Sequence, residues 1–319
     1  MRKRLCEINQ KKIFIMNHKK KIIVVGSCNT DMVVKSERLP LPGETILGGD
    51  FFMNPGGKGA NQAVAAARLG ADTTLVCKVG EDLFGSNAIA IFEKEGINTS
   101  FIYKSSDKPS GIALINVDKN GENCIAVASG ANGELSVDDI KSVKKEIEEA
   151  SYLLLQLEIP VETVLFAARL AYEAGTKVIL NPAPAPKSPL PEELFKYIDI
   201  IIPNETETQL ITDVKITDIE SAEAAMNKIL GKGVKNIVIT MGSHGAVTHE
   251  NNELIHIPAY KVKAIDTTAA GDTFCGALCV GLTDGLSLCE AIKFASKASS
   301  ISVTRMGAQS SMPYRKELE

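Results

Sequence analysis

The residues best suited to chemistry lie in segment 266–276, which reads Asp-Thr-Thr-Ala-Ala-Gly-Asp-Thr-Phe-Cys-Gly. Asp272 stands in a Gly/Ala turn before an apolar stretch, Phe274 to Leu282, which we predict to be a helix. The first N–H groups of a helix lack intrahelical partners and carry positive potential, so they can hold an anion. A carboxylate beside them can take a proton from a hydroxyl that attacks this anion. These are the minimum requirements for phosphoryl transfer to an alcohol, although Asp272 could equally cap the helix.

Two glycine-containing loops carry further hydrogen-bonding side chains. The first contains Asn29 and Asp31, and the second contains Lys58 and Asn61. Neither loop has the spacing of an ATP-binding phosphate loop or of a dinucleotide fingerprint. Asn and Asp side chains suit vicinal hydroxyls, and glycine allows close backbone approach, so a sugar is a reasonable ligand. The alternative is that Asn29 and Asp31 only form turns.

Polar groups also follow several predicted strands, where ligands gather in open α/β sheets. Glu158 follows the apolar run 152–157, and the alternative for it is a solvated loop carboxylate. Segment 204–207, Asn-Glu-Thr-Glu, suits a water-bridged Mg²⁺ or, alternatively, a helix cap with an acidic first turn. Segment 240–245, Thr-Met-Gly-Ser-His-Gly, offers backbone donors to a phosphate chain, or is a plain hairpin turn.

Short apolar runs alternate with helical patterns along the chain. This alternation predicts an α/β fold with a mainly parallel central sheet and helices on both faces. The predicted strands are 22–25, 74–79, 152–156, 178–180, 199–202 and 237–240. The predicted helices include 58–69, 84–95, 161–174 and 222–230.

Residues 29–56 and 111–128 break this alternation. The first segment is rich in Pro and Gly and has no helical pattern. The second reads as two strands around the turn Asp-Lys-Asn-Gly at 118–121, which is a strong hairpin signal. Together they predict a small β-sheet inserted into the α/β domain 21–319, in a position to act as a lid over a substrate.

Composition excludes several classes of protein. The formal net charge of −4 over 319 residues gives no basic field that would attract nucleic acid or an acidic membrane. The seven scattered cysteines contain no CxxC pair, which predicts reduced thiols in a cytoplasmic protein. No run approaches the length of a membrane span. Residues 1–20 form a basic extension that we expect to be disordered, with a targeting peptide as the alternative and Met16 as an alternative start.

Five segments together resemble the phosphofructokinase-B-type sugar kinase family. They are 26–31, 42–44, 56–63, 204–207 and 266–276, and their order matches that of the family. The resemblance runs from about residue 21 to the end of the chain. One set of residues looks more like the ribose-phosphorylating members than those that act on fructose or adenosine: Asn29, Asp31, Gly57, Lys58 and Asn61.

The resemblance implies that ATP phosphorylates the O5 hydroxyl of ribose, with Asp272 as the base and the backbone of Ala269, Ala270 and Gly271 as the anion hole. The implied ribose-binding residues are Asn29, Asp31, Gly57, Lys58, Asn61, Glu158 and Asp272. The implied ATP-binding residues are Asn204, Thr240, Gly242, Gly245, Gly271 and Ser296. Ser296 departs from the family, in which a larger Asn or His often meets the nucleotide.

The resemblance also implies cations and a partner. Glu207 would help to place Mg²⁺, or another divalent cation, through water. A K⁺ ion would fix the loop of the anion hole without touching substrate, held largely by carbonyl oxygens at Asp266, Thr268, Ser302, Arg305, Gly307 and Ser311. Homodimers would form by pairing of the lid strands. A kinase of deoxyribose, fructose or a nucleoside, and a non-catalytic sugar-binding sensor, are the alternatives.

Overall fold

The computed structural model describes residues 21–186, 188–250 and 253–319, so the extension predicted for residues 1–20 lies outside the described residues. Within these ranges the strands form one sheet of nine and one of four. The order in the large sheet is β13-β12-β11-β10-β9-β8-β1-β4-β5. Its strands are β1 (Lys21–Val25), β4 (Asp72–Gly80), β5 (Asn98–Ser105), β8 (Tyr152–Leu155), β9 (Lys177–Leu180), β10 (Ile200–Ile201), β11 (Asn236–Thr240), β12 (Ala246–Glu250) and β13 (Glu253–Ile257).

The large sheet is mainly parallel, as the sequence predicts. All pairs from β5 across to β11 are parallel, and only the pairs β11–β12 and β12–β13, at one edge, are antiparallel. Each of the six predicted strands is present, although β10 is shorter than the apolar run 199–202 suggests. The strands β5, β12 and β13 are additions to the prediction.

Helices cover both faces of the large sheet and create two apolar cores. Alternate residues of one strand enter different cores: Ile22 and Val24 join the first, and Ile23 and Val25 join the second. No helix in the described part of the chain has both the length and the apolar composition needed to cross a bilayer. The helices on the first face are α2 (Lys58–Arg68), α3 (Leu83–Lys94), α10 (Ala270–Thr283) and α11 (Leu288–Ser302). The other α-helices are α4 (Val137–Ser142), α5 (Lys144–Glu149), α6 (Val161–Ala174), α7 (Glu192–Lys196), α8 (Glu205–Thr212) and α9 (Ile219–Leu230).

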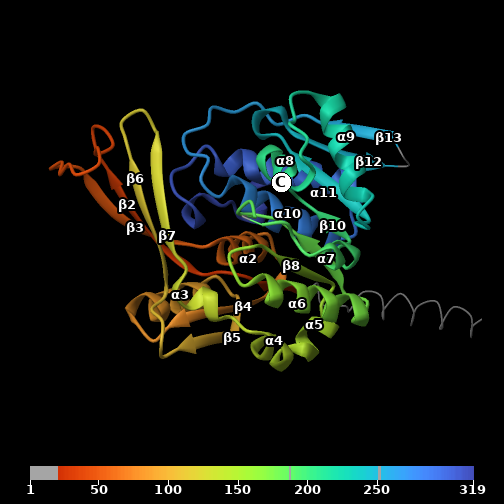
Figure 1. The fold of residues 1–319 in the computed structure, drawn as a ribbon, viewed down its shortest axis with the longest axis horizontal. Helices are drawn as coiled ribbons and strands as arrows, with labels where there is room; N and C mark the ends of the chain where they lie inside the picture. Colours follow the sequence, from red (N-terminus) through yellow and green to blue (C-terminus); the bar gives the residue numbers. More distant parts are fainter. Residues whose placement is uncertain (1–20, 187, 251–252) are drawn as a thin grey trace, which may run out of the picture.

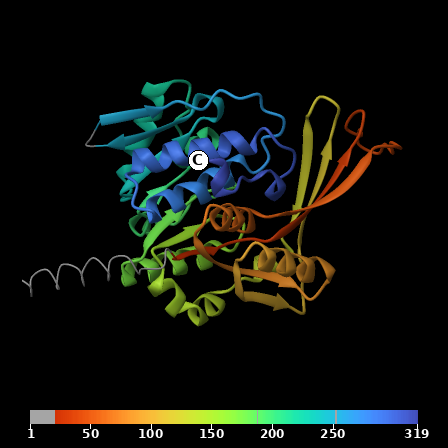
Figure 2. The same cartoon turned by 180° about the vertical axis from the view of Figure 1, so that it is seen from behind.

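The small sheet comes from the two segments that break the α/β alternation. Its order is β3-β2-β6-β7, in which β2 pairs parallel with β6 and the other pairs are antiparallel. Both views place this sheet at one side of the α/β body (Figures 1 and 2). The strands are β2 (Asn29–Lys35), β3 (Asp50–Gly56), β6 (Gly111–Val117) and β7 (Asn123–Ala128).

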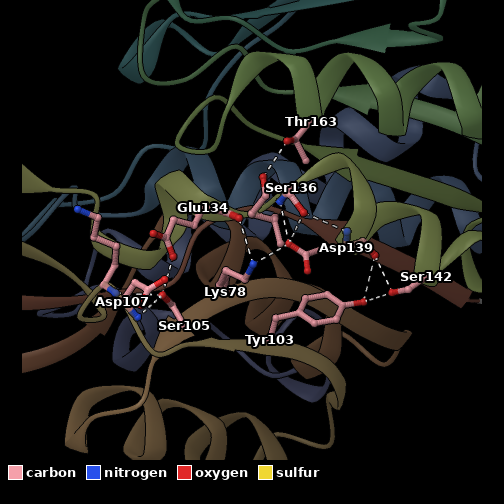
Figure 3. Close-up of polar contacts among 11 residues, drawn as sticks. Lys78, Tyr103, Ser105, Asp107, Glu134, Ser136, Asp139, Ser142 and Thr163 are labelled. Atoms are coloured by element: carbon pink, nitrogen blue, oxygen red, sulfur yellow. Dashed lines mark hydrogen bonds and ion pairs between the residues drawn. The ribbon is translucent and has the colours of Figure 1, made fainter.

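A half-buried polar network anchors the chain where it returns from the small sheet. The short 3-10 helix η1 (Gly130–Glu134) follows β7, and Lys78 of β4 donates to the backbone oxygen of Glu134 at 3.1 Å. The same ammonium group bonds to Asp139 Oδ2 at 2.8 Å, and Ser105 of β5 donates to the Glu134 carboxylate (Figure 3). The large sheet thereby fixes η1, and the position of η1 matters for the site described below.

The close approach of α2 to α10 requires a glycine. A Cβ atom added at Gly276 would lie 2.7 Å from Ala65 Cβ and 2.7 Å from the backbone oxygen of Gln62. Both distances are too short for real atoms, so only glycine lets the two helices pack at this separation. The contact places the start of α10 beside the polar side chains of the first turn of α2.

We therefore expect Gly276→Ala to lower the free energy of unfolding by about 1–3 kcal/mol, because the added methyl group overpacks the helix contact. Urea denaturation monitored by circular dichroism measures this change. Gly133→Ala is the matched control, since a Cβ atom at Gly133 meets no atom within 4 Å. Equal unfolding midpoints for the two variants would contradict the role assigned to Gly276.

Candidate active site

The N-terminus of α10 presents unpaired backbone amides beside an acidic side chain. Ala269 adopts the left-handed conformation, with φ of 57°, and the N–H of Thr273 closes the first turn on Ala269 O at 2.9 Å. In the described part of the chain, no acceptor faces the N–H groups of Gly271 and Asp272. The helix begins four residues before the predicted Phe274, because Ala, Gly and Asp contribute nothing to an apolar pattern. Asp272 therefore lies inside the first helical turn.

The Asp272 carboxylate points toward α2 and does not cap its own helix. It is 7% exposed; its Oδ2 accepts a hydrogen bond from Asn61 Nδ2 at 2.9 Å, and its Oδ1 accepts one from Gln62 Nε2 at 3.0 Å. The capping alternative is wrong. Two amide donors hold a carboxylate next to free helix-start amides, as a base beside an anion site requires.

The residues predicted to bind a sugar come together around the first turn of α2. Asn29 and Asp31 lie on β2, so the turn alternative is wrong for both. Gly57 has φ of 89°, and a Cβ atom there would lie 2.7 Å from the backbone nitrogen of Asn29. Glu158 accepts hydrogen bonds from the Lys58 N–H at 2.9 Å and from Ser27, so it is not the solvated loop carboxylate of the alternative.

Asn29 owes its orientation to η1. Asn132 Nδ2 donates to Asn29 Oδ1 at 2.7 Å and to Cys28 O at 3.0 Å, and Asn132 Oδ1 accepts from Cys28 N at 2.8 Å. These bonds leave the Nδ2 group of Asn29 free to act as a donor. The network of Figure 3 anchors η1 and therefore also positions Asn29, a residue predicted to bind the sugar.

The site gathers several carboxylates around one lysine. Burial, together with the nearby charges of Glu158 and Asp272, raises the pKa of Asp31 to about 6, although Lys58 opposes this shift. Burial acts to lower the pKa of Lys58, but Asp272 and Glu158 outweigh it and the net shift is upward. Lys58 therefore remains a cation that offsets part of the negative charge when no phosphate is bound.

The predicted ATP residues lie at the carboxyl end of β11 and on α11. Asn204 and Thr240 form a parallel β-bridge, and Gly242 and Gly245 flank the 3-10 helix η2 (Gly242–His244) in positive-φ conformations. Ser296 is half-buried on α11. That helix reaches the start of α10, where Ser299 Oγ donates to Ala270 O at 3.0 Å.

Glu207 forms a capping box with Asn204 at the start of α8. Its Oε2 accepts from Asn204 N at 2.9 Å and its Oε1 accepts from Asn204 Nδ2 at 3.0 Å, as the cap alternative predicts. Burial raises the pKa of Glu207, against the opposing effects of Asn204 and Lys58. The described residues contain no cluster of three or more His, Cys, Asp or Glu that could hold a metal. A single carboxylate whose two oxygens already accept from Asn204 suits a divalent cation only through a bridging water.

The residues predicted to surround K⁺ join the loop before α10 to the segment after α11. Asp266 Oδ1 accepts from the Thr268 N–H at 2.9 Å, and Asp266 Oδ2 accepts from the Gly307 N–H at 2.9 Å. Burial opposes these bonds, yet they hold the pKa of Asp266 below its usual value. Ser302 and Ser311 are buried, and Arg305 pairs with Glu317.

The sequence prediction missed several buried carboxamides that support the site. They are Gln62, Asn132, Gln156, Asn181 and Gln309. Gln62, Gln156 and Asn181 are polar residues within or just beyond an apolar element, and that signal could have revealed them. Asn132 and Gln309 lie in short 3-10 segments, GANGE and QSS, that carry no such signal.

Comparison with known proteins gives one consistent result. The model of the pfkB family of carbohydrate kinases matches residues 19–315. The chain is 44% identical to the ribokinase of Haemophilus influenzae, over 94% of this chain and 97% of that protein. It is 37% identical to the deoxyribokinase of Salmonella typhimurium, over 92% and 95%. The structure of Arabidopsis thaliana ribokinase complexed with ribose and ATP superposes with a TM-score of 0.86 at 34% identity, covering 94% of this chain and 97% of that one.

Proposed function

This chain belongs to the pfkB family of carbohydrate kinases, and we propose that it transfers the γ-phosphoryl group of ATP to the O5 hydroxyl of D-ribose. One observation carries the proposal. The Asp272 carboxylate and N–H groups that have no acceptor in the described part of the chain lie in the same first turn of α10. The products are ribose 5-phosphate and ADP.

In this reaction Asp272 accepts the O5 proton as O5 bonds to the γ-phosphorus and the bond from that phosphorus to the bridging oxygen of ADP breaks. The backbone of Ala269, Ala270 and Gly271 would face the charge that develops on the phosphoryl oxygens. The N–H of Gly271 has no other acceptor in the described part of the chain, whereas the N–H of Ala270 already donates to Thr267 O at 3.2 Å and would have to exchange that bond for the phosphoryl oxygen. Lys58 adds positive charge on the sugar side. Mg²⁺ bound with ATP, and reached from Glu207 through water, would neutralise phosphate charge.

We place the two substrates on opposite sides of Asp272. The sugar hydroxyls bond to residues of β2, the first turn of α2 and the end of β8: Asn29, Asp31, Gly57, Lys58, Asn61 and Glu158. ATP lies over the carboxyl ends of β10 and β11 and the start of α10: Asn204, Thr240, Gly242, Gly245, Gly271 and Ser296. The small sheet then acts as a lid over ribose.

The decisive assay measures ADP release from a panel of a pentose, a hexose and a nucleoside with MgATP. Ribose is expected to give the highest kcat/KM. Absence of ADP release with every acceptor would overturn the kinase assignment and favour a sugar-binding sensor.

Deoxyribose is the second candidate substrate, because a curated deoxyribokinase is 37% identical to the chain. The two sugars differ by one hydroxyl at C2. A site built to hydrogen-bond that hydroxyl discriminates strongly against its absence. Comparing kcat/KM for ribose and deoxyribose in the same assay decides between them.

A K⁺ ion held near Asp266 and Thr268 by backbone carbonyls would stiffen the loop that carries the anion hole. The existing bonds from Asp266 to Thr268 and Gly307 support this proposal, since they already join the two segments that would enclose the ion. Turnover is expected to be higher in K⁺ than in Na⁺ at equal ionic strength. Equal rates in the two salts would contradict the site.

We further propose a homodimer formed through the small sheet. Large apolar side chains stay exposed on it, among them Phe51, Leu114, Ile125 and Val127. Such a surface, with the open edges of β3 and β7, is suited to pairing with a second copy. Sedimentation at micromolar concentration is expected to give a dimer, and a monomer would contradict the proposal.

A further inference from the structure

Buried carboxamide side chains form a hydrogen-bonded group beside the proposed base, Asp272. Two amide donors from adjacent positions on α2 reach the two oxygens of Asp272: Asn61 and Gln62. We infer that Gln62 is a positioning residue, whose amide is fixed by hydrogen bonds to its neighbours so that its N–H points at Asp272 and orients the carboxylate. This inference rests on the proposed function, in which Asp272 is the base.

A backbone carbonyl oxygen, which can only accept, determines which way the side-chain amides of these carboxamides face. The backbone oxygen of Ile202 accepts from Asn181 Nδ2 at 2.8 Å, so Asn181 Oδ1 must point the other way and accepts from Gln62 Nε2 at 3.1 Å. The second hydrogen of that nitrogen then goes to Asp272 Oδ1, at 3.0 Å. A flipped Gln62 would place its oxygen against two other oxygens, and this repulsion excludes the flip.

Gln156 holds the other end of the Gln62 amide. Its Nε2 donates to Gln62 Oε1 at 2.6 Å, which commits the only acceptor of the Gln62 side chain. Gln156 Oε1 is buried and has no hydrogen-bond partner among the described residues, and it lies so close to Gly26 that a Cβ atom there would be 2.0 Å from it. The bond from Gln156 therefore fixes the direction in which the Gln62 amide faces.

The second donor to the base has a different role. Asn61 is predicted to touch ribose and is oriented by Gln309, whose Nε2 donates to Asn61 Oδ1 at 3.2 Å. Gln62 is fully buried, and each of its polar atoms is already used inside the protein. Loss of Gln62 should therefore change catalysis and leave sugar binding intact, whereas loss of Asn61 should change both.

Other titratable groups face Asp272 from several elements. The charged or acidic ones are Lys58 of α2, Asp31 of β2 and Glu207 of α8, with Glu158 beside Lys58. Burial raises the pKa of the Cys275 thiol on α10, so this neighbour is neutral. A neutral substitution at position 62 changes none of them. Because a hydrogen bond to a carboxylate favours its ionised form, a shift in the pH profile of the variant reports the lost Gln62 contact.

The test is Gln62→Met, which keeps an unbranched side chain of similar length and removes the amide. We expect kcat to fall about tenfold or more, ribose KM to stay within about twofold, and the acidic limb of kcat against pH to move up by about one unit. Thr176→Val is the matched control, because it removes one buried hydroxyl donor at the amino end of β9, which bonds to Ile147 O at 2.7 Å and to Ala150 O at 3.4 Å. An unchanged kcat and an unchanged pH profile in Gln62→Met would overturn the inference.

Gln156→Met provides a second test if Gln62→Met does not fold. It leaves the Gln62 donor in place but removes the hydrogen bond to Gln62 Oε1, so the amide is held less firmly. A smaller fall in kcat with the same direction of pH shift is therefore expected. A normal kcat and pH profile in this variant would also overturn the inference. If the wild type turns over no acceptor with ATP, the proposed function itself fails; if Asp272→Asn is inactive and both glutamine variants are normal, only the role of Gln62 fails.

Discussion

Replacing Asp272 with Asn is expected to lower kcat for ribose phosphorylation by about 10²–10⁴-fold while ribose still binds. The amide is the same size but cannot accept the O5 proton. The protein also loses some stability, because Asn61 Nδ2 and Gln62 Nε2 both donate to the carboxylate and one of them would face an NH₂ group in the variant. Coupled detection of ADP measures turnover, and calorimetric titration with ribose measures binding.

Asp199→Asn separates loss of the base from loss of a buried carboxylate. Asp199 is 6% exposed, against 7% for Asp272, and accepts hydrogen bonds from Val178 N, Lys177 and Lys235. Its partners lie at the amino ends of the strands, on the opposite edge of the sheet from Asp272. We expect this control to unfold at lower urea concentration and to retain turnover. A kcat within about threefold of the wild type in Asp272→Asn would remove Asp272 from the mechanism.

Local sequence signals predicted the elements that carry the site. Continuous apolar runs marked β1, β4, β8, β9 and β11, because strands covered on both faces need no polar alternation. The turn Asp118 to Gly121 likewise predicted the hairpin of β6 and β7. The start of α10 was placed one turn too late, since the four residues that open the helix, 270–273, carry no apolar periodicity.

Contacts between distant residues could not be predicted in the same way. The partner of Asp272 on α2 is 211 residues away, and Gln156 is 94 residues from Gln62. No local pattern specifies which buried amide faces which oxygen, because that choice depends on the helix packing at Gly276 and on the orientation fixed at Ile202. The sequence singled out Asn61, one of the two α2 donors to Asp272, but not Gln62, the other.

Asp31→Asn is expected to change ribose affinity and stability in opposite directions. Ribose Kd should rise about 10²-fold or more, because a carboxylate that accepts hydroxyl donors is replaced by a weaker acceptor. The free protein should become more stable at pH 8 by about 1–3 kcal/mol, because burial and the charges of Glu158 and Asp272 raise the pKa of Asp31 from 3.8 to about 6. Calorimetric titration and urea unfolding measure the two effects.

The sign of the stability effect follows from linkage. The folded protein binds the Asp31 proton more tightly than the unfolded chain, so its contribution is fully present below pH 3.8 and is lost as the pH rises through about 6. The difference in free energy of unfolding between Asp31→Asn and the wild type should therefore grow as the pH rises from 3.8 to about 6, and stay constant above about pH 7. Saturating ribose should stabilise the wild type far more than the variant, because only a ligand that binds the folded state adds stability. Equal stabilisation of both proteins by ribose would mean that Asp31 does not touch the sugar. A stability difference that does not change with pH would mean that the charge of Asp31 does not destabilise the ligand-free protein.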